Sequence, residues 1–481
     1  MWLDLKKNYK RASFTPRMSS ANIITKFFDH TMNQLSVIKF GGSSIADFTA
    51  MSKCADIVVE TLGIKIIVIS ALATITRLLI SLSKQNIPVE NKKIIIQEIT
   101  DRHYQILNFF KNVNKIKNKL NSLLKKAADL ADILSTQKDL KLTAELLALG
   151  EQMSSLLFTA LLNERNIPAT NFDVRKVLKT NSDFLNAKPN VTEIEKCCGQ
   201  YLIPLCKKQT IVTQGFIGSD TNGDTTILGM ESSDYTAALL AEAIRADHFE
   251  IWTDVSGVFT ADPKIVPHAR SIPELSYQEA LELTKFGAKV LHPATMQPAL
   301  RKNIKFCVAC NHNPQQKTWI YDKKNNDIAN LCAISLKKNQ TLLTIKNNKR
   351  TDFSTSISNI FSKYNINPDL ITNNNSFISI VIDDNQQELT QKSLLAQNFL
   401  NELTDIGQIE IQKQLAIIAL IGNDVHKHQS INNTLFDYLK TNNINPIFYS
   451  SSSHSIYFLV NDSIAEKLTE ELHDKLFGGH T

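Results

Sequence analysis

The sequence predicts an α/β domain with a mainly parallel central sheet and helices on both faces, followed by two small α+β units. Between residues 35 and 321, β-branched runs of strand length alternate with helical segments. This alternation is typical of parallel strands joined by crossover helices. After a polar stretch at residues 323–327 the elements become shorter, and a strand–helix pattern occurs twice. That recurrence indicates a duplicated module.

The first domain begins with Leu35–Ile38, an apolar run with the composition of a buried strand. The nearly continuous β-branched run Ile64–Ser70 predicts a central strand that is covered on both faces. In residues 92–160, Ile and Leu recur at three- and four-residue spacing between lysines, which predicts helices. Further strands are expected at Gln209–Phe216, Phe249–Thr253 and Ile304–Ala309, and helices at Asp234–Ile244 and Tyr277–Leu283.

The remainder of the chain divides into two similar units. We expect a domain at residues 32–321 and a regulatory region at 328–481, with units at about 340–406 and 412–481. Such units often sense a ligand, and plain dimerisation is the alternative. The expected elements are Leu342–Lys346, Ile357–Tyr364, Phe377–Asp383, Gln391–Leu403 and Gln408–Gln412, then Ala416–Ile421, Asn432–Lys440, Ile447–Ser450, Ile456–Val460 and Ile464–Leu476.

Composition narrows the class of protein. The hydrophobic content of 43% and charged content of 21% are those of a globular protein. The net charge of +6 is spread thinly, so no nucleic-acid partner is expected. No apolar run reaches the roughly 18 residues that span a bilayer, so no membrane association is expected. The seven scattered cysteines indicate reduced thiols in a cytoplasmic protein without a zinc site.

Residues 1–31 carry six Lys/Arg up to position 30 and no apolar core of a secretory signal. We interpret them as a disordered extension or as the product of an upstream start codon, since Met32 directly precedes the first strand. A transit peptide is the alternative.

The segment Lys39–Ser44 (KFGGSS) predicts an anion site at the end of the first strand. Glycines let backbone N–H groups approach a phosphate closely, and a lysine ammonium neutralises its charge. A Gly-Gly turn after a strand is also common without any ligand. No Walker sequence G-x-x-x-x-G-K-[ST] occurs in the chain, so this is another kind of phosphate loop.

Four further segments add charged and small residues to the first domain. Gly150-Glu151 offers a carboxylate at a helix, where a solvated surface residue is the ordinary interpretation. Gly215–Asp234 is rich in Gly, Ser, Thr and Asp and leads into a helix, whose N-terminus favours anions. Trp252–Val255 closes a strand with Thr253 and Asp254, and Phe286–Pro293 supplies a lysine after a glycine. Together these are the groups that phosphoryl transfer from a Mg²⁺-bound nucleotide uses.

Seven ordered motifs of this chain resemble those of the aspartokinase family, most closely its monofunctional lysine-sensitive type. They are KFGGSSIADF, GEQMSSLLF, FDVRKV, VTQGFIG with TTILG and SDYTAALLAEA, IWTDVSGVFTADP, YQEALELTKFGAKVLHPAT and LIGND. The resemblance covers residues 33–478 and implies an amino-acid-kinase fold followed by two ACT domains of βαββαβ topology. It implies transfer of the γ-phosphoryl of ATP to the β-carboxylate of L-aspartate, the first step of the diaminopimelate route to lysine.

The resemblance also implies roles for individual residues. The catalytic residues are expected to be Lys39, Gly41, Gly42 and Asp254. Aspartate would contact Ser70, Thr76, Glu151, Ser233 and Asp234, with Glu151 on its α-ammonium. ATP would contact Lys39, Gly41, Gly42, Ser43, Thr253, Asp254, Phe259, Lys264, Lys289 and Val290, with Mg²⁺ carried on the nucleotide and no other metal. Phe353 and Asp369 would meet a lysine effector, and the ACT domains would pair chains into a homodimer or a dimer of dimers.

The chain departs from the family pattern mainly on the aspartate side. Met230 and Glu231 stand where Arg and Gly are usual, and Thr74 and Arg77 where Gly and Asn are usual. Arg77 is a candidate replacement for the missing positive charge. Milder changes are Phe259 for Tyr and Lys264 for Arg. Two alternatives therefore stay open: a catalytically reduced, nucleotide-binding regulatory subunit, and a kinase acting on another carboxylate.

The sensing region departs as well. Asp352–Ser354 and Asn373–Ser376 replace the family's usual segments, while Asp369 is retained. We therefore expect lysine inhibition to be weakened or lost.

Overall fold

The computed structural model describes residues 34–230, 232–288, 293–323, 330–347, 352–364, 366, 368–373, 376–383 and 393–478. The predictions for residues 1–31, for Glu231 and for Lys289 and Val290 fall outside the described residues.

An eight-stranded sheet forms the centre of the first domain, in the order β10-β12-β11-β7-β1-β2-β4-β3. Every neighbouring pair is parallel except β11 and β12, which confirms the prediction of a mainly parallel sheet. The strands are β1 (Leu35–Phe40), β2 (Ile64–Ile69), β3 (Ala169–Phe172), β4 (Thr210–Gln214), β7 (His248–Thr253), β10 (Glu274–Ser276), β11 (Lys305–Cys310) and β12 (Asn313–Tyr321). Two small hairpins, β5 (Ile217–Ser219) with β6 (Thr225–Ile227) and β8 (Val258–Phe259) with β9 (Ser271–Ile272), stand outside it.

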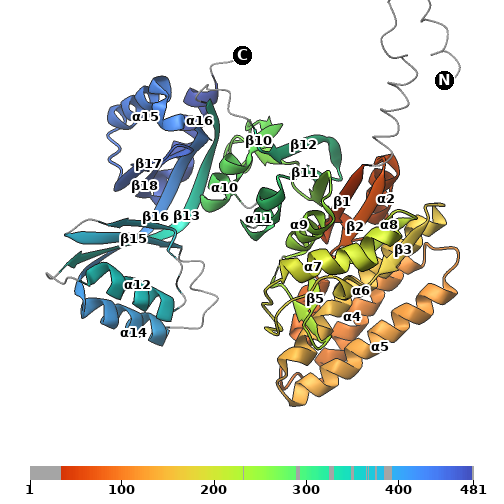
Figure 1. The fold of residues 1–481 in the computed structure, drawn as a ribbon. Coiled ribbons are helices and arrows are strands. Elements are labelled where there is room, and N and C mark those ends of the chain that lie inside the picture. The colour runs from red at the N-terminus through yellow and green to blue at the C-terminus, as the bar shows by residue number, and fades with distance from the viewer. Residues whose placement is uncertain are drawn as a thin grey trace, which may run out of the picture.

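Helices cover both faces of this sheet (Figure 1). Helices α2 and α6 pack together, while α9 packs against α7 and α11 as well as against β1 and β7. The helices are α2 (Phe48–Glu60), α3 (Ile75–Leu82), α4 (Val89–Leu107), α5 (Asn114–Thr136), α6 (Leu140–Glu164), α7 (Val191–Cys197), α8 (Ile203–Cys206), α9 (Ser233–Ile244), α10 (Tyr277–Lys285) and α11 (Pro293–Lys302). Among the described helices, α6 alone has the length and hydropathy of a membrane span, and 78% of that window is buried inside the protein.

The second region is one six-stranded antiparallel sheet in the order β14-β15-β13-β16-β18-β17. Its strands are β13 (Asn330–Asn347), β14 (Leu370–Asn373), β15 (Phe377–Asp383), β16 (Gly407–Asn423), β17 (Phe448–Ser451) and β18 (Ser455–Asn461). Its helices are α12 (Phe353–Lys363), α14 (Ser393–Thr404), α15 (Gln429–Thr441) and α16 (Asp462–Phe477).

The two α+β units are interleaved rather than consecutive. Residues 342–347 of β13 pair with 407–412 of β16, whereas residues 330–337 pair with 417–423. The ladder shifts register between these halves, near Asn339 and Gln414, which both have positive φ. Residues 330–337 of β13 therefore belong to the C-terminal unit, although they precede the whole of the other unit in the sequence. The expected boundaries at about 340–406 and 412–481 miss this exchange, because strand pairing over long sequence distances leaves no local signal.

The regulatory sheet packs against the first domain through alternate residues of its strands. Leu415, Ile417 and Ala419 of β16 belong to the large core cluster that also contains Phe286. Ala416, Ile418 and Leu420 face the cluster under α15 and α16. Because successive side chains of a strand point to opposite faces, β16 is buried on both sides. The contact between the two regions is thus a hydrophobic core.

Candidate functional site

The carboxyl ends of four neighbouring strands meet at one edge of the sheet of the first domain. In the register, Phe40 of β1 lies between Ile69 of β2 and Trp252 of β7, and Ile69 pairs with Gln214 of β4. The segments that follow these strands are those singled out in the sequence. The edge where parallel strands end is where ligands bind in open α/β sheets.

Lys39 lies at this edge and pairs with the first turn of α9. Its Nζ is 2.6 Å from Oδ1 of Asp234, and the two side chains are only 10% and 17% exposed. Sheet and helix thus place an ammonium beside the N-terminal end of α9, whose unpaired N–H groups carry partial positive charge. Two of the predicted site residues, far apart in sequence, are in contact.

Gly42 lies where no side chain fits. A Cβ on Gly42 would come within 2.6 Å of the Ala71 carbonyl oxygen, and the Gly42 carbonyl accepts a hydrogen bond from Ala73 N at 3.2 Å. Gly41 N donates to the Trp252 carbonyl at 2.9 Å. The loop after β1 is therefore held between the ends of β2 and β7. Ser43, by contrast, is exposed at the surface of this loop.

Asn311 is a residue of this site that sequence reasoning missed. It is 4% exposed, and its Nδ2 donates to the Ser44 carbonyl at 3.1 Å. It links the glycine loop to the end of β11, which lies two strands away from β1 in the sheet. A signal was present, because Asn311 directly follows a strand, β11, that ends at the same edge.

Glu151 is a buried carboxylate of α6, not the surface residue that its helix would ordinarily suggest. It is 3% exposed, and its Oε1 accepts a hydrogen bond from Ala71 N at 3.1 Å. Its Oε2 is buried and has no hydrogen-bond partner among the described residues. Burial raises the pKa of Glu151 from 4.5 to about 8. A buried acceptor of this kind suits a cationic ligand.

The loop between β2 and α3 joins Glu151 to the glycine loop. Ser154 Oγ donates to the Ser70 carbonyl at 2.6 Å, and a Cβ on Gly150 would lie 2.9 Å from Cβ of Ala71. Thr74 in this loop has φ of +70°, a left-handed conformation that favours glycine. Thr76 is half-buried in the first turn of α3, and Arg77 beside it is exposed.

The segment before α9 also approaches β4 closely. A Cβ on Gly215 would lie 2.6 Å from Oγ of Ser233, which is 7% exposed. Ser232 stands at the N-cap but bonds back to the Gly229 carbonyl at 2.7 Å instead of capping the helix. The backbone N–H groups of the first turn are therefore not consumed by that side chain. Met230 in this loop is 55% exposed.

The expected nucleotide residues extend from the end of β7 along the β8–β9 hairpin. Thr253 Oγ1 donates to Asp254 Oδ1 at 3.0 Å, and Asp254 is exposed. Phe259 is half-buried, and Lys264 is exposed with its N–H bonded to Asp262. Thr253 and Asp254 lie next to the Lys39 loop, since Gly41 N is bonded to the carbonyl of Trp252, the residue before them.

The two expected effector residues lie in the regulatory region, Phe353 at the start of α12 and Asp369 directly before β14. Asp369 Oδ2 is 2.6 Å from Nζ of Lys337, which also lies 3.4 Å from Asp383. Phe353 is 4% exposed and belongs to the core cluster of its unit. A pocket of about 520 Å³ lies beside it, between α12 and strands β14 and β15; its lining includes Ser354, Phe361, Ile371 and Asn373.

Comparison with known proteins identifies the chain's relatives. The Amino acid kinase family matches residues 34–310, and an ACT domain matches residues 418–476. Lysine-sensitive aspartokinase 3 of Escherichia coli (strain K12) is 38% identical over 449 residues, which cover 93% of this chain and 100% of that relative. The chain belongs to the aspartokinase family.

Solved aspartokinase structures share the whole architecture. E. coli aspartokinase III in complex with aspartate and ADP (R-state) is 37% identical with a TM-score of 0.81, and covers 92% of this chain and 100% of its own. The same enzyme with lysine and aspartate (T-state) has a TM-score of 0.77 at 38% identity over 92% and 99%. An aspartokinase of Chlamydia pneumoniae is 28% identical over 91% of this chain and 97% of that relative. These similarities do not favour the alternative that the protein is a catalytically reduced regulatory subunit.

Proposed function

We propose that this protein transfers the γ-phosphoryl of ATP to the β-carboxylate of L-aspartate, giving 4-phospho-L-aspartate. This reaction is the first step toward lysine, threonine and methionine. The observation that carries the proposal is the continuous contact between a buried, half-paired carboxylate and a glycine loop with a buried lysine. Glu151 holds Ala71, and Ala73 holds Gly42. The binding site for the amino acid, at Glu151, is therefore adjacent to the binding site for the phosphate, at the glycine loop.

On the phosphate side, the loop after β1 holds the group in transfer. The backbone N–H groups of Gly42 and Ser43 contact the phosphoryl group, and Lys39 neutralises charge as this group moves between oxygens. Asp234, paired with Lys39 at 2.6 Å, positions that ammonium. Mg²⁺ arrives with ATP and neutralises its phosphates.

On the acceptor side, Oε2 of Glu151 receives the α-ammonium of aspartate. This contact satisfies the buried oxygen and fixes which end of the substrate faces the phosphate. Ser70, Thr76 and Ser233 supply further polar groups around the acceptor. Met230 leaves the α-carboxylate without the bidentate arginine contact that is usual in the family, so aspartate binds less tightly.

On the nucleotide side, Thr253 and Asp254 contact ATP at the end of β7, and Phe259 and Lys264 extend this surface along the β8–β9 hairpin. Lys289 and Val290 complete the expected nucleotide contacts.

Regulation and assembly follow from the second region. We propose lysine as a weak effector near Phe353 and Asp369, because the chain's own Lys337 already occupies Asp369.

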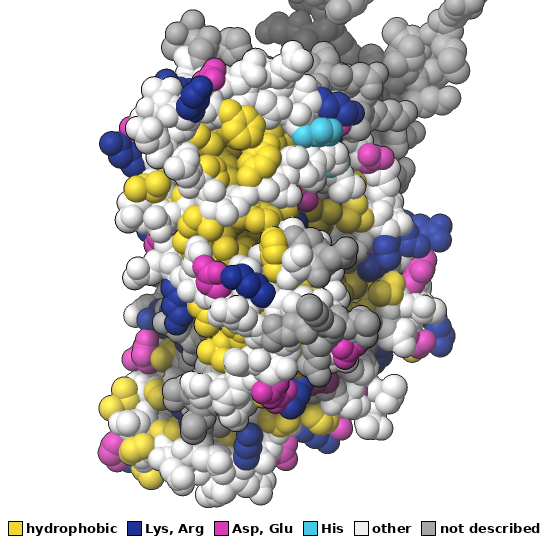
Figure 2. Space-filling model, turned by 90° about the vertical axis from the view of Figure 1, so that its left-hand side faces the viewer, with side chains coloured by type: hydrophobic (Ala, Val, Ile, Leu, Met, Phe, Trp, Pro, Cys, Tyr) yellow, Lys and Arg dark blue, Asp and Glu magenta, His cyan; other side chains and the backbone are white. Residues whose placement is uncertain are grey.

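Figure 2 shows hydrophobic side chains gathered on the outer side of the regulatory region, and large hydrophobic residues including Ile371, Phe436 and Tyr449 are at least 40% exposed. Exposed apolar patches mark interaction surfaces. We propose a cytoplasmic homodimer, or a dimer of dimers, joined through these units; light scattering would give at least twice 54.0 kDa.

An acceptor panel tests the proposed substrate. ADP release is measured with Mg-ATP and, in turn, L-aspartate, D-aspartate, L-glutamate, succinate and N-acetyl-L-glutamate. L-aspartate is expected to give the highest kcat/KM. Succinate, which lacks the ammonium, is expected to lose most of the rate in the wild-type protein and little further in Glu151→Gln. A higher kcat/KM with another carboxylate would contradict the assignment to aspartate.

A further inference from the structure

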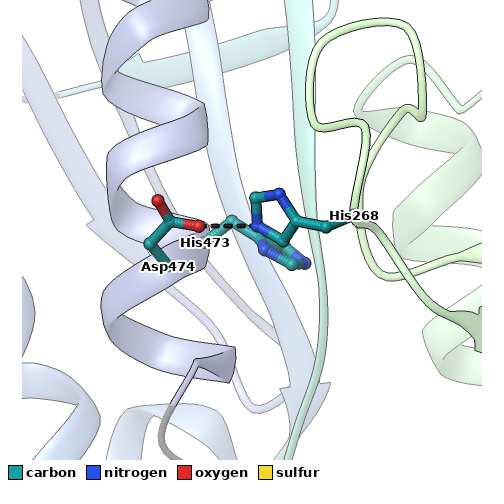
Figure 3. A group of neighbouring side chains, drawn as sticks. All are labelled: His268, His473 and Asp474. Carbon is teal, nitrogen blue, oxygen red and sulfur yellow. Dashed lines mark ion pairs between the residues drawn. The ribbon is translucent and has the colours of Figure 1, made fainter.

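A cluster of His268, His473 and Asp474 lies where the catalytic domain meets the regulatory region (Figure 3). His268 belongs to the loop between β8 and β9, and the other two residues belong to α16. One ring nitrogen of each histidine and one carboxylate oxygen lie within 4.8 Å of one another. The cluster lies outside the residues assigned above to aspartate and ATP.

His473 is the fixed member of the cluster. It is 2% exposed, and its Nε2 is 2.8 Å from Oγ1 of Thr260. Its other nitrogen, Nδ1, is buried and has no hydrogen-bond partner among the described residues. In the tautomer whose Nε2 donates its proton to Thr260, Nδ1 presents a bare lone pair, which is the form in which imidazole binds a metal.

His268 and Asp474 are the adjustable members. Their side chains are 54% and 57% exposed, and His268 Nε2 lies 2.6 Å from Asp474 Oδ1. Around a tetrahedral Zn²⁺ with bonds of about 2.0–2.2 Å, neighbouring ligand atoms stand about 3.3–3.6 Å apart. The close pair, at 2.6 Å, must therefore open by about 0.7–1 Å, and the widest pair, within 4.8 Å, must close by up to about 1.5 Å; the exposed side chains achieve this by rotation.

We propose that His268, His473 and Asp474 bind a zinc-class divalent cation that clamps the β8–β9 loop to α16. Two imidazoles and a carboxylate are nitrogen and oxygen ligands that suit Zn²⁺, and water takes the fourth position. Thr260 holds His473 from behind, as outer partners of metal-bound histidines do. The same junction already carries a bond from Arg270 Nη2 to the Phe477 carbonyl at 2.8 Å. The metal would add a stronger link to a junction that apolar packing and a few hydrogen bonds already hold together.

Cobalt spectroscopy tests the site without reference to activity. Full-length, tag-free protein is stripped with a chelator, desalted and titrated with Co²⁺ as the spectroscopic substitute for Zn²⁺. One equivalent per chain is expected to give the intense visible bands of tetrahedral cobalt with nitrogen and oxygen ligands, and Zn²⁺ is expected to displace it. Zn²⁺ is also expected to raise the melting temperature of the wild-type protein.

Variants of the two exposed ligands distinguish metal binding at this site from metal binding elsewhere on the protein. His268→Ala and Asp474→Asn are each expected to weaken Zn²⁺ binding at least about tenfold and to abolish the melting shift. His426→Ala removes an exposed histidine elsewhere in the regulatory region and is expected to change neither. Equal Zn²⁺ affinity of His268→Ala and wild type would overturn the proposal. So would the charge-transfer bands of thiolate ligation, or the absence of saturable binding.

Discussion

At the scale of single residues, the aspartate half of the site rests on Glu151. Its position is unusual because a carboxylate on a helix is ordinarily solvated, whereas this one is 3% exposed and half-paired. Burying an ionised group without a full set of partners costs free energy, and the group responds by holding its proton. The bound substrate would supply the missing partner.

The state of Glu151 predicts how catalysis depends on pH. Because burial raises its pKa to about 8, the free protein holds the neutral acid below that pH. The kcat/KM for aspartate is therefore expected to rise from pH 6 to about pH 8 and then level off. The same shift means that Glu151 costs the ligand-free protein stability as the pH rises from 4.5 to about 8.

Glu151→Gln is the matched variant for this dependence. It is expected to lower kcat/KM for aspartate by about 10- to 100-fold, because a charged hydrogen bond worth about 1.5–3 kcal/mol is lost. It is also expected to remove the rise of kcat/KM between pH 6 and about pH 8. Steady-state kinetics between pH 6 and 9 measure both effects. If kcat/KM of the variant rose with pH in the same way, the pH dependence would belong to another group.

Met230 predicts a gain of function. The side chain is 55% exposed in the loop before α9, so an arginine can be accommodated there without repacking a core. Met230→Arg is expected to lower the KM for aspartate by about tenfold or more, because a bidentate contact to the α-carboxylate returns. Met230→Gln, which lacks the charge, serves as the control. No difference between the two variants would mean that this position does not reach the substrate.

At the scale of elements, the site depends on turns at the ends of strands, and the sequence predicted these unevenly. The glycine loop after β1 was predictable, because Gly-Gly after an apolar run is a local signal. The partner of Lys39 was not, since Asp234 comes from another element far along the chain. The interleaved β13 and β16 were missed for the same reason. Alternation of apolar residues shows that a strand exists, but its neighbours are fixed only by tertiary packing.

Thr74 at the start of α3 predicts a stability change. A β-branched residue at φ of +70° is strained by about 1–2 kcal/mol, and glycine relieves that strain at an entropic cost of about 0.5–1 kcal/mol. Thr74→Gly is therefore expected to raise the free energy of unfolding by roughly 0.5–1 kcal/mol. Thr74→Ala, which keeps a Cβ, should gain less. Denaturant unfolding of the full-length protein measures both changes. A lower free energy of unfolding for Thr74→Gly would contradict the strain at Thr74.

At the scale of the whole molecule, a shared hydrophobic core joins catalysis to regulation. The regulatory sheet packs against the catalytic domain beside α10, and Ser335 of β13 bonds to the Phe286 carbonyl at 2.7 Å. Gly287, with φ of +102°, lies against Lys337, the residue that pairs with Asp369. Asp369 is therefore connected through Lys337 and Gly287 to the segment that leads to Lys289.

Lysine sensitivity is expected to depend on Lys337. In the wild-type protein lysine must compete with this internal ammonium for Asp369, so inhibition is expected to be weak. Lys337→Met removes the competitor and is expected to lower the lysine concentration for half-inhibition by about tenfold, the equivalent of about 1.4 kcal/mol. Lys338→Met, at a neighbouring lysine that pairs with Glu466 instead, is the control. Strong inhibition of the wild type that Lys337→Met leaves unchanged would contradict this account.

The central claim is that the protein phosphorylates the carboxylate of aspartate, and trapping the acyl phosphate tests it most directly. With Mg-ATP, L-aspartate and hydroxylamine, the wild-type protein is expected to form β-aspartyl hydroxamate in proportion to time and enzyme. Lys39→Met, which removes the ammonium at the phosphoryl group, is expected to lower the rate at least about a hundredfold. The contrary result would be ATP binding without any aspartyl hydroxamate above background.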